Sequence, residues 1–141
     1  GLLPRYPNVS LIWSANDAMA FGVMRAAGEQ GRALHYAALN NSARVLQARI
    51  DGQVEVLASG HFLLGACAMV MLSDHARGLD FIERGGKDQE ARLLRIIDGE
   101  QAQRLLSRLG QADIGMDFRQ FSAVAQPQLQ RYDCSIASLL N

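Results

Sequence analysis

The sequence predicts an α/β domain built around a parallel β-sheet. Short apolar runs typical of strands alternate with helical patterns through the first eighty residues, and the connections between them are only a few residues long. Each of the first three predicted strands also ends in small polar residues. The chain has 141 residues, of which 49% are hydrophobic. This length and composition suit one domain with a sizeable core.

The first strand and helix occupy about residues 9–31. An apolar strand is predicted over about 9–14, and the polar pair Asn16 and Asp17 follows it. Either side chain can cap the N-terminus of a helix, which the apolar spacing predicts over about 17–30. Gly31 then ends the helix.

Two more strand–helix pairs follow. A strand is predicted over 35–39, and Ser42 suits the N-cap of a helix over 43–51. The third strand, over 54–58, leads through Ser59 into a helix over about 62–77. That helix is apolar on almost every side, which predicts burial on more than one face.

The pattern is less regular after residue 79. We expect a polar loop over 84–90, a strand over 91–97 and a helix over about 100–109. Residues 111–126 are expected to be irregular, apart from a short element over 116–121. A last amphipathic helix is predicted around 127–131, and the apolar C-terminal tail is expected to dock.

Composition excludes several classes of function. Basic and acidic residues balance at 14 each, so this segment carries no electrostatic signature of nucleic-acid binding. The sequence has no nucleophile elbow, zinc-protease motif, phosphate-binding loop or dinucleotide fingerprint, and we predict neither an enzyme nor a cofactor. His35, His61 and His75 are too scattered to predict a metal site. No apolar run is long enough to span a bilayer.

The two cysteines, Cys67 and Cys134, lie far apart in the sequence. Cys67 lies among apolar residues, so the favoured interpretation is a buried free thiol. A disulfide is the alternative that the count leaves open.

Candidate binding residues follow the strands. Parallel strands joined by right-handed crossovers end at one edge of the sheet, so Asn16, Asn40 and Ser59 are expected to converge there. His61 lies just beyond, at a pocket mouth or in a hinge or capping position. Helix capping is the alternative role for the two asparagines. For Trp13 the favoured interpretation is core packing, and stacking on a sugar ring is the alternative.

The stretch Asn16-Asp17-Ala18-Met19-Ala20-Phe21-Gly22 resembles the second lobe of type I periplasmic binding proteins, as do 36–41, 43–52 and 54–65. The resemblance implies the three-layer sheet of that lobe, with an extended C-terminal region. Residues 1–60 would supply the βαβαβ portion. Residues 61–141 would supply a hinge-crossing helix and the C-terminal elements. Because family members are about twice this length, a C-terminal fragment is expected.

The resemblance also implies a function. In sugar-binding members the positions of Asn16, Asn40 and Ser59 contact the ligand, although Asn40 and Ser59 replace an Asp and a longer polar side chain. The expected role is periplasmic binding of a small polar ligand, either a sugar or a signal molecule, for a membrane permease or a sensor kinase. The alternative is the effector lobe of a LacI-like transcription regulator. Alone, the apolar helix over 62–77 is expected to favour a homodimer.

Overall fold

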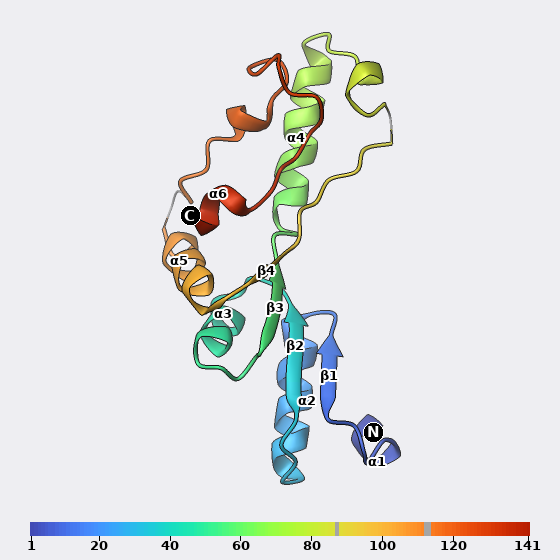
Figure 1. The fold of residues 1–141 in the computed structure, drawn as a ribbon, viewed down its shortest axis with the longest axis vertical. Helices are drawn as coiled ribbons and strands as arrows, with labels where there is room; N and C mark the ends of the chain where they lie inside the picture. Colours follow the sequence, from blue (N-terminus) through green and yellow to red (C-terminus); the bar gives the residue numbers. More distant parts are fainter. Residues whose placement is uncertain (87, 112–113) are drawn as a thin grey trace.

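The computed structural model describes residues 1–86, 88–111 and 114–141 (Figure 1). The predicted loop 84–90 and irregular segment 111–126 therefore lie partly outside the described residues, at 87 and at 112–113. The elements, in chain order, are α1 (Leu2–Arg5), β1 (Leu11–Ser14), α2 (Asp17–Glu29), β2 (His35–Leu39), α3 (Ala43–Ile50), β3 (Val56–Ser59), α4 (Leu63–Ala76), η1 (Ile82–Arg84), β4 (Arg95–Ile97), α5 (Gly99–Leu109), η2 (Phe118–Phe121) and α6 (Ala137–Leu140).

The predicted α/β class is confirmed by a mostly parallel sheet flanked by helices. The strands lie in the order β1-β2-β3-β4. The first three are parallel, as predicted, and β4 pairs antiparallel with β3, a direction that the sequence did not indicate. The predicted strand over 91–97 is shorter than expected, because the pairing begins only at Arg95, opposite Ser59.

Just beyond that pair, two segments of backbone meet at Gly60. A side-chain Cβ at Gly60 would lie 2.0 Å from the carbonyl oxygen of Leu93, and the residue has φ +120°. Glycine is therefore required on both steric and conformational grounds.

The two faces of the sheet differ in burial. Ser14, Ala38, Leu57 and Ile97 are register partners that form one row across all four strands, and each is at most 3% exposed. The opposite face, which we call the open face, carries the exposed apolar side chains Leu11, Trp13, Val56 and Ile96.

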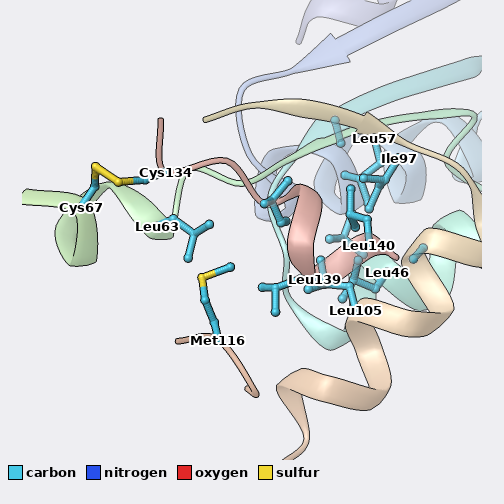
Figure 2. Packing of buried hydrophobic residues seen from close by; sticks show 14 of the residues in the cluster. Leu46, Leu57, Leu63, Cys67, Ile97, Leu105, Met116, Cys134, Leu139 and Leu140 are labelled. Carbon is cyan, nitrogen blue, oxygen red and sulfur yellow. A yellow bond between two sulfur atoms is a disulfide. The ribbon is translucent and has the colours of Figure 1, made fainter. Parts of the chain in front are cut away.

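The core lies between the buried row and the helices of the C-terminal half. Figure 2 shows Leu57 and Ile97 of the sheet close to Leu46 of α3 and Leu140 of α6, with Leu105 of α5 beside them. These five side chains are at most 5% exposed. The predicted docking of the apolar tail is thus confirmed, because α6 supplies part of this core.

Side-chain hydrogen bonds cap the N-termini of α2, α3 and α5, which follow β1, β2 and β4. The backbone N–H of Met19 donates to Asn16 Oδ1, and that of Val45 donates to Ser42 Oγ. Asp98 and Gln101 form a reciprocal capping box at the start of α5. The predicted caps at Asn16 and Ser42 are confirmed, and each satisfies a backbone donor that the helix leaves unpaired.

The helix α4 extends away from the sheet (Figure 1). Leu63 and Cys67 are buried, whereas Leu64, Met69 and Leu72 are each more than 60% exposed. The prediction of burial on more than one face is wrong for this chain. The element η2 packs against α4, and Leu64, Met69 and Leu72 form an exposed apolar strip on this helix. Among the described residues, no helix has the length and apolarity to cross a membrane.

A disulfide joins α4 to the C-terminal segment. Cys67 and Cys134 are bonded, with their Cα atoms 5.8 Å apart (Figure 2). The favoured interpretation of free thiols is therefore wrong. Sequence spacing could not reveal the pairing, because the fold alone brings the two residues together.

A buried carboxylate makes a second connection between the same two segments. Asp74 of α4 is 1% exposed and accepts hydrogen bonds from Ser122 Oγ (2.6 Å), the Ala123 N–H (2.7 Å) and the Tyr132 hydroxyl (2.8 Å). Burial alone would raise the pKa of Asp74, but these hydrogen bonds outweigh it and leave the pKa below its ordinary value. Burial and the Asp74 carboxylate raise the pKa of Tyr132.

The helix predicted around 127–131 is absent, and turns occupy this segment. The Arg84 side chain donates to the carbonyl oxygens of Leu129 (3.2 Å) and Pro127 (3.4 Å). These carbonyls are thus satisfied by a side chain from another part of the chain instead of by a helical N–H.

Removal of the disulfide is expected to destabilise the protein. The variant C67S/C134S should lose about 4 kcal/mol of unfolding free energy, because the bond closes a loop with a sequence separation of 67 residues. Urea denaturation monitored by circular dichroism measures this loss. A reducing agent should have a similar effect on the wild type and none on the variant. A wild type insensitive to reduction would contradict the prediction.

The substitution Asp74→Asn is expected to change how stability depends on pH. Because the folded-state pKa is lowered, Asp74 stabilises the fold above its unfolded pKa, about 3.9, and this contribution is lost as the pH falls through the folded pKa. The variant should lose about 2 kcal/mol at pH 7 and show a shallower decline below pH 4. Urea denaturation from pH 7 to pH 2.5 tests both expectations. The exposed Asp88→Asn variant is the control with the same change in charge.

Candidate ligand-binding site

The residues predicted to converge do follow neighbouring strands at one edge of the sheet. Asn16 and Asn40 come directly after the carboxyl ends of β1 and β2, and Ser59 is the last residue of β3. The Asn40 N–H also donates to the Ala58 carbonyl oxygen (3.2 Å), which fixes the β2 turn against β3. Ligands commonly bind at this edge of open α/β sheets.

Asp17 forms the strongest polar cluster at this edge. Its Oδ1 accepts from Asn40 Nδ2 (2.8 Å) and from the Ala18 N–H (2.8 Å), and its Oδ2 accepts from Ser42 Oγ. Partial burial alone would raise the pKa of Asp17, but the hydrogen bonds from Ser42, Asn40 and Ala18 outweigh it and lower the pKa. The carboxylate also lies in the first turn of α2, where the helix dipole favours a negative charge.

The two predicted asparagines have structural roles that leave part of each amide unused. Asn16 Oδ1 caps α2, and Asn40 Oδ1 accepts from the Asn41 N–H (2.9 Å). Both side chains are partly exposed. The predicted capping role is confirmed for Asn16, and contact with a ligand stays a prediction for both residues.

Ser59 and His61 each contain a buried polar atom. Ser59 is fully buried, and within the described part of the chain neither Ser59 Oγ nor His61 Nδ1 has a hydrogen-bond partner. Such atoms are uncommon in folded proteins and often mark functional positions.

His61 lies in a groove of about 500 Å³, separate from the Asp17 cluster. The groove is lined by His61, Leu64, and residues 91–95. Arg92 and Arg95 bring positive charge to it, and sequence reasoning missed both because they belong to a segment distant from His61 in the chain. Both roles expected of His61, at the mouth of the ligand pocket or in a hinge or capping position, stay predictions, because this groove contains none of Asn16, Asn40 and Ser59.

Trp13 does not pack in the core. Its side chain is 63% exposed on the open face of the sheet, so the favoured interpretation of core packing is wrong. The pleat explains the difference, because Ser14 occupies the buried row and its neighbour Trp13 must point to the opposite face. The alternative, stacking on a sugar ring, stays a prediction.

A second groove, of about 540 Å³, lies between α4 and the η2 region. Its lining includes Met69, Val70 and Phe118, with Arg77 and Arg119 as its cations. None of the predicted site residues lines it. Met69 belongs both to this lining and to the exposed strip on α4.

The remaining histidines serve local roles. His35 is exposed and pairs with Glu55, and the His75 ring lies 5.5 Å from that of Phe81. The described residues contain no group of three or more His, Cys, Asp or Glu side chains that could hold a metal ion.

Asp17 is the residue whose role the sequence did not reveal. Its place beside Asn16 indicated a cap, but its contacts are with Asn40 and Ser42, more than twenty residues away. The polar segment 40–42, after the next strand, was the only available signal that such a contact could form.

No protein-family profile matches the chain, and no curated protein matches it. Among solved structures, it is similar to a periplasmic sugar-binding protein from Pseudomonas fluorescens, with 44% sequence identity and a TM-score of 0.88. The match covers 99% of this chain and 44% of that protein, so the chain spans less than half the length of this structure. The chain therefore has the fold of part of a periplasmic binding protein.

Proposed function

We propose that this chain is part of a periplasmic solute-binding protein that binds a small polar ligand. The observation that carries the proposal is the similarity to the sugar-binding protein from Pseudomonas fluorescens over almost the whole chain. Binding and release leave the ligand chemically unchanged, so the protein acts as a carrier or sensor and not as an enzyme. The ligand is a sugar or a signal molecule, and a membrane permease or a sensor kinase reads the bound state.

The polar edge at Asn16, Asn40 and Ser59 is the proposed ligand-binding wall, in which Ser59 is buried in this chain; His61 is proposed to contribute from its own groove, and Trp13 is available for stacking. Amide and hydroxyl groups can both donate and accept hydrogen bonds, as sugar hydroxyls do. In the proposed arrangement, residues 1–60 belong to one lobe, and residues 61–141 carry the hinge crossing and the C-terminal elements. The remaining chain supplies the facing wall of the cleft, which closes on the ligand by hinge motion.

Two apolar surfaces support a larger parent protein. The open face of the sheet and the exposed strip on α4 carry large apolar side chains, including Trp13, Leu64 and Met69. Apolar patches of this kind mark interfaces. The similar protein has more than half of its length outside the match, which is enough chain to cover both surfaces.

The disulfide favours the periplasmic role over the alternative of a LacI-like transcription regulator. Disulfides persist in oxidising compartments such as the periplasm and are rare in the cytosol, where such regulators act. The bond between Cys67 and Cys134 therefore supports a periplasmic location.

Ligand binding is expected to require the two asparagines. In a protein that contains this chain and the remaining lobe, N16A/N40A should weaken binding of a recognised monosaccharide by about thirtyfold to several hundredfold, because each of the two hydrogen bonds lost costs about 1–2 kcal/mol. Isothermal titration calorimetry with D-ribose, D-xylose, D-glucose and D-galactose measures the affinities. Asn8→Ala is the control, and equal affinity in the double variant would reject the assignment of the site.

The isolated 141-residue chain is expected to bind these sugars weakly and to self-associate. Its uncovered apolar surfaces favour a homodimer. Sedimentation equilibrium should show dimers, and M69E/L72E, which places charge in the α4 strip, should shift the chain to monomer. A wild-type chain that stays monomeric at high concentration would contradict this expectation.

A further inference from the structure

We infer that Asp17 is a positioning residue of the proposed ligand site, which holds the turns after β1 and β2 together as one wall. That these turns form a wall of the ligand site rests on the proposed function. That Asp17 joins the two turns, through hydrogen bonds that we call the joint, rests on its own contacts. Asp17 lies at the start of α2, whereas its partners Asn40 and Ser42 lie in the connection between β2 and α3.

Each oxygen of the Asp17 carboxylate accepts a hydrogen bond from a residue far away in the sequence. Oδ1 receives the Asn40 amide at 2.8 Å, and Oδ2 receives the Ser42 hydroxyl. The Ala18 N–H also donates to Oδ1 (2.8 Å) and fixes the carboxylate relative to α2. Hydrogen bonds to an ionised acceptor are stronger than neutral ones, so this joint resists rotation of either turn.

The joint also determines which way the Asn40 amide points. A carboxylate only accepts hydrogen bonds, so the Asn40 nitrogen must face Asp17, and the Asn40 oxygen then receives the Asn41 N–H at 2.9 Å. One amide hydrogen and one oxygen lone pair remain without a partner among the described residues. Position 40 can therefore both donate to a ligand hydroxyl and accept from it.

The same geometry predicts a cost for a carboxylate at position 40 of this chain. A carboxylate there would lie within hydrogen-bonding distance of the Asp17 carboxylate, and neither group could donate. Two close like charges cannot both ionise without cost. In this chain Asp17 thus pairs with the amide at position 40, and an exchange of the two residue types should restore the pairing.

The test is a double-mutant cycle with D17N, N40D and D17N/N40D. N40D should lower the melting temperature at pH 7 by several degrees, because it places a second carboxylate against that of Asp17. Adding D17N to N40D should raise it again, because an amide at position 17 can donate to a carboxylate at position 40. The variant D88N/N40D has the same net charge as D17N/N40D, but position 88 has no hydrogen bond to position 40. Its melting temperature should therefore not recover. A double variant whose loss equals the sum of the single losses would overturn the inference.

A spectroscopic readout separates positioning from general stability. In a ¹⁵N–¹H correlation spectrum, D17N should shift or broaden the Asn40 side-chain amide signal, which is assigned by its loss in N40D. The signals of Asn8 and Asn141 should stay in place. An unchanged Asn40 signal in D17N would show that Asp17 does not hold this amide.

A binding measurement tests whether the hydrogen bonds of Asp17 matter for the proposed ligand site. For any monosaccharide that the longer wild-type protein binds, D17N should weaken the affinity about tenfold and D88N should leave it unchanged. Equal affinity in D17N would overturn the positioning role at the site. If no sugar binds to the wild type, the proposed function fails, and the cycle and the amide signal still decide whether Asp17 joins the two turns.

Discussion

The antiparallel pairing of β4 with β3 returns the chain to the sheet after it has left through α4. It adds Ile97 to the buried row, which places α5 against α3 and α6 against α5. It also brings Leu93 against Gly60, where no side chain fits. Without this pairing, the buried row would end at Leu57 of β3, and the core would lose Ile97.

Sequence reasoning located the elements that local chemistry defines. Polar residues after β1 and β2 predicted the caps at Asn16 and Ser42, and strand–helix alternation predicted three parallel strands. It also placed Asn16, Asn40 and Ser59 at one edge, because topology dictates where parallel strands end. Contact of these three residues with a ligand stays a prediction.

The features that sequence reasoning missed depend on contacts between distant segments. Neither the disulfide nor the partners of Asp74 can be read from spacing, since they link α4 to residues 122–134. Trp13 was assigned to the core on its apolarity, although the pleat turns it to the open face. The turns at 127–129 follow from Arg84, more than forty residues earlier.

These contacts join residues that are far apart in the sequence, and this separation affects the order of folding. Strand β2 meets β1 and β3 across short stretches of chain, whereas the disulfide and the Asp74 hydrogen bonds join α4 to residues 48 to 67 positions later. Closing a longer loop costs more chain entropy and slows the contacts that need it. We therefore expect the sheet and its first helices to form early, with α4 as a late addition that oxidation then locks in place. Full attachment of α4 would then require surroundings that oxidise the two thiols.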